Sequence, residues 1–411
     1  MTTNKLWSPK LVLKLPIQEC RINDVIFIPH TEIIINCSED RWIRIYNENQ
    51  GRYWVTHQES VPASVSRLVY SVESNTLYAA LENGTIMEFL LTPDKNGFTH
   101  VHDYLAHYEK ITDISYSFYD KFILSVSRDN TLSVFSSLSH LQIITHAQQY
   151  PISSLCYSSG TNYCFIGDVI GNITLLKIQK SDDGSCRADF VRLLKAHTKT
   201  VNSLSFNKKN FTLASGSDDG RVIVWEINET NVVHYQLVMH SNSVSCVSWW
   251  TKGLASQIVP GETNKNLDVL ISSGTDGILA FWLITPQRKP CAVWNESDTC
   301  QLCNLPFFWN IKGFWNRGSI NISRQHHCRM CGKAVCDNCS PFLAKMPKLG
   351  FELPSRVCSE CNKELDPRDQ TSLCNTMNTK SELLRFSIDD SKNRMLSIDK
   401  DKLIKIWDLN V

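Results

Sequence analysis

The chain has 411 residues, with 42 Lys and Arg against 41 Asp and Glu, and a formal net charge of +1 at pH 7. A charge this close to balance excludes a global field that would draw the chain onto nucleic acid, so any anion site must be local. The length exceeds that of a typical single core and indicates two or three domains or one large repeat fold. The sequence contains no apolar run of about 20 residues, so we expect no membrane-spanning helix.

The N-terminal segment and half of the cysteines indicate a reducing compartment. Residues 1–5 include a lysine but no apolar stretch, so we expect no secretory signal. Outside one dense region, eight cysteines are scattered without a pattern, and we interpret them as buried free thiols of a cytoplasmic protein. These are Cys20, Cys37, Cys156, Cys164, Cys186, Cys246, Cys291 and Cys374.

From Arg21 onward one unit recurs: a strand of small residues, a turn, and an alternating apolar strand that ends in an aromatic or apolar residue. In the clearest copy, residues 213–225, Asp219-Gly220 predicts a hairpin turn and Val222 and Val224 alternate with Ile223 and Trp225. The second strands end about 41–57 residues apart until the last interval, which is about 125 residues. They end at Tyr46, Phe89, Phe135, Leu176, Trp225, Trp282 and Trp407.

This unit resembles the WD40 repeat, in which each copy forms a four-stranded blade of a β-propeller. Seven copies imply an all-β fold with seven blades, and the strand near residues 11–15 is expected to close the ring as the outer strand of blade seven. His197, Ser215, Asp219 and Trp225 look like the hydrogen-bonded tetrad of that family. His197 and Asp219 could also be read as a catalytic pair, but their recurrence favours a structural network.

The long last interval predicts an insertion of about 80 residues between blades six and seven. Residues 285–290 form a polar, proline-bearing exit from blade six, and residues 366–380 form a polar return. The expected domains are the closing strand with blades one to six at 1–287, a small domain at 288–366, a linker at 367–380 and blade seven at 381–411.

The insertion contains eight cysteines in four C-x-x-C pairs. Each pair supplies two thiolates from one tight turn, so four pairs complete two tetrahedral zinc sites with no position left for water. This predicts two structural Zn²⁺ ions, and the regular spacing argues against disulfides or chance clustering. The pairs are Cys300/Cys303, Cys328/Cys331, Cys336/Cys339 and Cys358/Cys361.

Residues 324–329, Arg-Gln-His-His-Cys-Arg, and residues 356–358, Arg-Val-Cys, resemble the FYVE zinc finger, with Gln325 in place of a basic residue. The resemblance implies interleaved pairs. One zinc ion would bind Cys300, Cys303, Cys336 and Cys339, and the other Cys328, Cys331, Cys358 and Cys361. The Trp-x-x-Asp signature of the family is altered, because Ser297 follows Trp294 at the third position, so Asp298 or Glu296 would replace the aspartate.

By the same resemblance, the basic residues bind the headgroup of phosphatidylinositol 3-phosphate. Guanidinium groups match phosphate oxygens, so Arg324, Arg329 and Arg356 would hold the phosphates. His326 and His327 would form hydrogen bonds with the inositol hydroxyls, and Asp298 would orient a histidine or a hydroxyl.

An apolar segment precedes the basic run. In the family this segment enters the bilayer, which implies that role for Ile320 and Ile322, while Phe314 and Trp315 would anchor at the interface. The alternative is that these side chains pack on the finger or on blade six. Phe307 matches a core position of the finger.

Together, these features resemble the WD repeat and FYVE domain-containing protein family over essentially the whole chain. The resemblance implies a non-enzymatic cytoplasmic adaptor, peripheral on early endosomes, which binds phosphatidylinositol 3-phosphate through the finger and protein partners through the propeller. A single finger gives modest membrane affinity, so self-association would supply a second contact. The alternative is a protein-interaction or RING-like zinc module without lipid selectivity. The sequence shows no nucleophile motif or phosphate-binding glycine loop, so no enzyme is expected.

Overall fold

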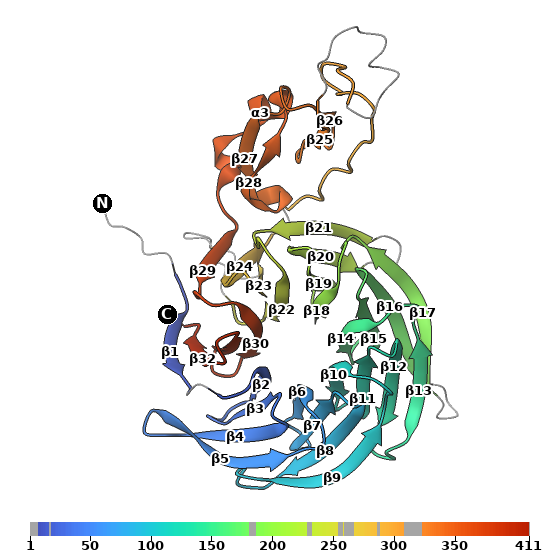
Figure 1. The fold of residues 1–411 in the computed structure, drawn as a ribbon, viewed down its shortest axis with the longest axis vertical. Helices are drawn as coiled ribbons and strands as arrows, with labels where there is room; N and C mark the ends of the chain where they lie inside the picture. Colours follow the sequence, from blue (N-terminus) through green and yellow to red (C-terminus); the bar gives the residue numbers. More distant parts are fainter. Residues whose placement is uncertain are drawn as a thin grey trace.

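The computed structural model is a ring of seven β-sheets with a small finger domain attached to its rim (Figure 1). It describes residues 7–15, 18–180, 186–227, 232–253, 258, 267–285, 288–307 and 323–410. The fold is all-β and forms a seven-bladed propeller, which confirms the expected architecture.

Blades one to four are regular four-stranded antiparallel sheets in chain order. Blade one contains β2 (Ile22–Phe27), β3 (Ile34–Ser38), β4 (Trp42–Asn49) and β5 (Arg52–Ser60). Blade two contains β6 (Val65–Ser71), β7 (Thr76–Leu81), β8 (Thr85–Leu91) and β9 (Phe98–Leu105). Blade three contains β10 (Ile111–Ser117), β11 (Phe122–Ser127), β12 (Thr131–Ser136) and β13 (Gln142–Ala147). Blade four contains β14 (Ile152–Ser158), β15 (Tyr163–Asp168), β16 (Asn172–Lys180) and β17 (Cys186–Lys195).

The last three blades include segments distant in the sequence. Blade five contains β18 (Val201–Asn207), β19 (Thr212–Ser217), β20 (Arg221–Ile227) and β21 (Val232–Val238). Blade six contains β22 (Val244–Trp250), β23 (Asp268–Gly274), β24 (Ile278–Ile284) and β29 (Cys374–Asn378). Blade seven contains β30 (Leu383–Asp389), β31 (Arg394–Asp399), β32 (Ile404–Asp408) and β1 (Lys10–Lys14).

The burial pattern along each strand agrees with the position of that strand in its blade. In blade five, every residue of β19 is buried, because this strand is covered on both faces by neighbouring blades. The outer strand of blade one, β5, instead alternates between buried or half-buried and exposed residues over most of its length. The turn before β20 is made by Asp219-Gly220, and Gly220 has the positive φ of 79° that favours glycine.

The recurring histidines form buried structural networks. His197 Nδ1 lies 3.1 Å from Asp219 Oδ2, and its Nε2 lies 2.8 Å from Ser215 Oγ. Trp225 Nε1 donates to the same hydroxyl at 2.9 Å. The same arrangement recurs around His240 in blade six, which confirms the structural interpretation over the catalytic one.

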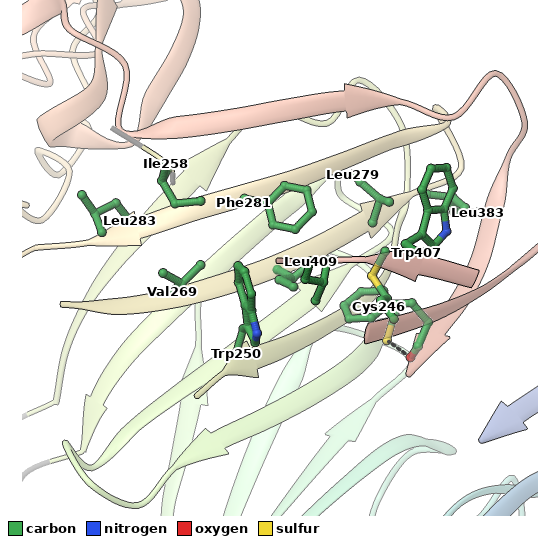
Figure 2. Packing of buried hydrophobic residues seen from close by; sticks show 13 residues of the cluster. Cys246, Trp250, Ile258, Val269, Leu279, Phe281, Leu283, Leu383, Trp407 and Leu409 are labelled. Atoms are coloured by element: carbon green, nitrogen blue, oxygen red, sulfur yellow. Dashed lines mark hydrogen bonds between the residues drawn. The ribbon is translucent and has the colours of Figure 1, made fainter. Parts of the chain in front are cut away.

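Neighbouring blades pack through their apolar faces. Figure 2 shows this for blades six and seven, where Trp250, Phe281 and Trp407 lie in one cluster of 13 buried residues. The thiol of Cys246 is part of this cluster and donates to the carbonyl of Phe386 at 3.7 Å. The expectation of buried free thiols holds for half of the eight scattered cysteines. Cys37, Cys164, Cys246 and Cys374 are buried, whereas Cys20, Cys156, Cys186 and Cys291 are only partly buried.

The ring closes as the sequence predicts. β1 pairs antiparallel with β32, with Lys10 opposite Asp408 and Lys14 opposite Lys405. The N–H of Leu15 extends the ladder by donating to the carbonyl of Ile404 at 2.9 Å. The first strand of the chain thus covers the otherwise open edge of blade seven.

The finger leaves the ring one strand earlier than expected. Its return segment contains the 3₁₀ helix η2 (Pro367–Gln370) and β29, and β29 pairs antiparallel with β24. Residues 367–380, expected as a linker, therefore include the outer strand of blade six, and the finger is inserted between the third and fourth strands of that blade. The difference has a physical reason: β29 is short and polar and lies half exposed at a sheet edge, so its sequence does not read as a strand.

The finger itself is built from short elements. They are β25 (His326–His327), β26 (Ala334–Val335), β27 (Phe342–Met346), η1 (Pro347–Leu349), β28 (Phe351–Val357) and α3 (Ser359–Glu364).

Candidate metal centre and basic face

The eight paired cysteines come together as two groups of four. One group contains Cys300, Cys303, Cys336 and Cys339, and the other contains Cys328, Cys331, Cys358 and Cys361. Within each group all four sulfur atoms lie within 4.8 Å of one another. This is the interleaved arrangement in which the first and third pairs share one site and the second and fourth pairs share the other.

The sulfur geometry fits zinc. Tetrahedral coordination with Zn–S bonds of about 2.3 Å separates the sulfurs by about 3.8 Å. The sulfurs of Cys303 and Cys336 are 3.7 Å apart, and those of Cys331 and Cys358 are 4.0 Å apart. The finger therefore holds two structural Zn²⁺ ions, one in each group.

Backbone N–H groups donate hydrogen bonds to sulfur atoms in both groups, which favours metal binding. Cys336 N–H donates to Cys300 Sγ at 3.4 Å, and Cys358 N–H donates to Cys328 Sγ at 3.3 Å. Burial raises the pKa of Cys300, but the N–H groups of Cys303, Leu302 and Cys336 outweigh it and lower this pKa to about 7. In contrast, burial and the neighbouring Cys328 raise the pKa of Cys331 to about 11. Four thiolates at this spacing repel one another, so the fully ionised groups require a cation.

The finger has a small core around the metal sites. Phe307 is 1% exposed and packs with Cys300, Val335 and Phe351, which confirms its expected core position. β25 pairs with β26, with His326 opposite Val335 and His327 opposite Ala334. This pairing fixes the two histidines, which directly precede the second cysteine pair, beside the strand that leads into the third pair.

His326 and Arg356 share one acid that the sequence analysis did not identify. His326 Nε2 lies 2.8 Å from Asp337 Oδ1, and Arg356 Nη1 lies 3.3 Å from the same oxygen. Arg356 Nη1 also donates to the carbonyl of Ser340 at 2.8 Å. Asp337 lies inside the third C-x-x-C pair, and that position was the only signal available in the sequence.

His327 and Arg329 are held by one aromatic ring. The imidazole of His327 stacks on Trp294 with ring centroids 4.7 Å apart and planes 8° apart, and its Nε2 lies 3.1 Å from the carbonyl oxygen of Asn295. The guanidinium carbon of Arg329 lies 4.4 Å from the centre of the Trp294 ring. Burial, followed by the charge of Arg221 in blade five, lowers the pKa of Arg329. Arg329 therefore lies near the propeller as well as in the finger.

The remaining predicted residues divide into two sets. Arg324 and Asp298 are exposed, and the carbonyl of Asp298 accepts a hydrogen bond from the N–H of Phe307 at 3.0 Å. His326 lies against Asp337, an acid outside the altered Trp-x-x-Asp segment. The predicted membrane-inserting residues lie outside the described part of the chain. These are Phe314, Trp315, Ile320 and Ile322.

Comparison with known proteins agrees with the geometry. The FYVE zinc finger family model matches residues 293–367, and the WD domain, G-beta repeat model matches residues 98–136 and 188–226. Mouse WD repeat and FYVE domain-containing protein 1 is 30% identical over 402 residues, which cover 98% of this chain and 93% of the relative. The chain belongs to the WD repeat and FYVE domain-containing protein family. Human WD repeat and FYVE domain-containing protein 2 is 30% identical over 403 residues, covering 98% of this chain and 96% of the relative.

A shorter match extends outside this family. Vacuolar protein sorting-associated protein 27 of Kluyveromyces lactis is 30% identical over 106 residues, which are 26% of this chain and 16% of that protein. The WD40 propeller and the FYVE finger are both non-catalytic domain types. None of the described helices is long and apolar enough to cross a bilayer.

Proposed function

We propose that this protein is a non-enzymatic adaptor that binds phosphatidylinositol 3-phosphate in endosomal membranes through the finger and presents protein partners on the propeller. The observation that carries this proposal is the basic face, defined here as Arg324, His326, His327, Arg329 and Arg356. Four of these five side chains are fixed by contacts within a scaffold braced by two zinc sites. Such a fixed cluster loses little conformational entropy when it binds a ligand.

The chemistry of the face suits a phosphorylated polyol. The guanidinium carbon of Arg329 lies 4.4 Å from the centre of the Trp294 ring, and this contact would hold the planar guanidinium for two hydrogen bonds to one phosphate. Arg356 Nη1 lies beside the carboxylate of Asp337 and donates to the carbonyl of Ser340. The exposed Arg324 supplies a further cation. The imidazoles of His326 and His327 provide hydrogen-bonding groups beside these cations, where ring hydroxyls would lie.

The membrane contact extends beyond the headgroup in this proposal. Ile320 and Ile322 would enter the bilayer, with Phe314 and Trp315 at the interface and Asp298 orienting the bound headgroup. A single headgroup contact and a short apolar segment give modest affinity, so self-association or a partner on the propeller would stabilise the adaptor on early endosomes.

The test is co-sedimentation of the full chain with vesicles of neutral lipid containing either phosphatidylinositol 3-phosphate or phosphatidylinositol. We expect selective sedimentation with the phosphorylated lipid and at least about tenfold weaker binding for Arg329→Ala, because a charge-assisted phosphate contact contributes about 1.5–3 kcal/mol. Lys363→Ala is the matched control, since it removes an exposed cation of α3 outside the basic face.

The same assay distinguishes the alternative function. A protein-interaction or RING-like zinc module would sediment equally with both kinds of vesicle, or with neither, and Arg329→Ala would change nothing. Either result would reject the lipid proposal.

A further inference from the structure

The junction between finger and propeller is built as a continuous sheet. β28 of the finger pairs parallel with β21 of blade five, with Phe351 opposite Val238, so blade five becomes a six-stranded sheet ending in β27. The N–H of Val238 donates to the carbonyl of Gly350 at 2.8 Å. The side chain of Val238 also packs against the apolar cluster of the finger.

Close backbone contact at this point depends on a glycine. Gly350 ends η1 with a φ of 85°, and a Cβ placed on it would lie 1.6 Å from the carbonyl oxygen of Gln236 in β21. No rotation of a side chain relieves that overlap, because the obstructing atom belongs to the backbone. A larger residue at position 350 must therefore move the finger away from blade five.

One buried arginine links three separate segments at the same junction. Arg288 is only 7% exposed. Its Nε and Nη2 donate to the carbonyl of Leu283 at 3.0 and 2.9 Å, and its Nη1 donates to Pro347 of η1 at 3.0 Å. Nη2 also donates to the carbonyl of Leu373, just before β29, at 3.3 Å. Arg288 therefore ties the chain leaving blade six to the finger and to the chain returning from it.

A buried acid holds the same returning segment from the finger side. Glu352 in β28 is 2% exposed, and its carboxylate accepts hydrogen bonds from the hydroxyl of Ser372 at 2.8 Å and the N–H of Leu373 at 3.2 Å. Burial raises the pKa of Glu352, and the nearby charge of Arg288 opposes that effect. Two buried charged groups with this many partners are typical of a fixed interface and not of a flexible connection.

We propose that Arg288 is a positioning residue that locks the finger to blades five and six, so that finger and propeller move as one rigid body. In Figure 1 the finger projects outward from the rim beside β21 and β29 and does not overlap the ring. Resting on the proposed lipid function, this lock makes a membrane-bound finger hold the propeller by its rim in one fixed orientation. Its protein partners would then meet the ring at a constant angle to the bilayer.

The experiment measures the distance between two spin labels, introduced as unnatural amino acids at the exposed positions Lys209 in blade five and Lys363 in α3, by double electron–electron resonance on the full chain without lipid. We expect one narrow distance distribution for the otherwise unmodified protein and for Lys289→Ala, which alters the exposed neighbour of Arg288. Arg288→Ala should lose the narrow distribution while zinc content stays at two ions per chain. Arg288→Lys should restore it only partly, because one ammonium group cannot reach three carbonyls at once.

Gly350→Ala tests the same lock from the finger side, and it should also lose the narrow distribution even if Arg288→Ala fails to fold. A broad distribution in the unmodified protein would overturn the proposal. A narrow, unshifted distribution in folded Arg288→Ala would also overturn it, as would the same result in Gly350→Ala if Arg288→Ala fails to fold. Lipid is absent from this measurement. Failure to bind phosphatidylinositol 3-phosphate would therefore reject the proposed function and leave the lock standing.

Discussion

Two side chains outside the basic run, Trp294 and Asp337, hold the imidazoles and guanidiniums of the finger in place. Trp294 stacks on His327 and supports Arg329, although it is itself 48% exposed. Asp337 lies between His326 and Arg356. The basic residues and Trp294 could be identified from their sequence motifs, but the contacts that Trp294 and Asp337 make with the basic residues could not. Their contacts arise only after the four cysteine pairs have folded around two metal ions.

In the propeller, single residues contribute to stability through the buried hydrogen-bond networks. Burial raises the pKa of Asp219, but the hydrogen bond and charge of His197, with the N–H groups of Arg221 and Thr198, outweigh it and lower the pKa below its ordinary value. A carboxylate with a lowered pKa stabilises the fold above the pKa of the unfolded chain, and that contribution is lost as pH falls through the folded-state pKa.

Asp219→Asn should therefore destabilise the propeller by about 1–3 kcal/mol at neutral pH, since a buried charged partner is removed. Urea unfolding followed by tryptophan fluorescence measures this difference, which should shrink as pH is lowered below about 4. Asp401→Asn, at an exposed turn of blade seven, is the control and should leave stability unchanged. An equally stable Asp219→Asn protein at neutral pH would contradict the structural role of the network.

At the scale of elements, the blades were predictable because each carries its own local signals. The Asp-Gly turn, the small-residue strand and the aromatic end identify the second and third strands of blade five. Two junction elements were not predictable. β29 is polar and half exposed, and the pairing of β21 with β28 joins segments separated by more than 110 residues. Arg288 lies in a polar run expected to be an exposed exit, and only the folded finger makes it a buried group.

The finger depends on its metal ions more than the ring does. Cys331→Ser should lose one of the two zinc ions and unfold the finger, because metal binding supplies most of the folding energy of such small domains. The propeller should keep its own cooperative unfolding transition, since its blades pack through separate apolar clusters. Zinc analysis and calorimetry of the full chain measure both effects.

Cys164→Ser is the matched control, because Cys164 is a buried thiol of blade four that belongs to neither metal group. It should retain both zinc ions. If Cys331→Ser abolished the propeller transition as well, the finger and ring would not be separate folding units.

At the scale of the whole molecule, a metal-braced basic face is attached through a rigid junction to the rim of a closed ring. The ring has no free edge at its closure, because β1 completes blade seven. The finger departs from within blade six, between β24 and β29, and rests on blade five, so both ends of the insertion are anchored in the propeller. This arrangement suits an adaptor in which the orientation of the partner surfaces relative to the membrane contact stays constant.

The lipid selectivity of the zinc-loaded finger is tested by a vesicle titration of the full chain with phosphatidylinositol 3-, 4- or 5-phosphate, with bound zinc measured in the same samples. We expect two zinc ions per chain, saturable binding to the 3-phosphate, at least about tenfold weaker binding to the other two, and loss of binding when a chelator removes the metal. A zinc-loaded protein that binds all three lipids equally, or none of them, would contradict this selectivity.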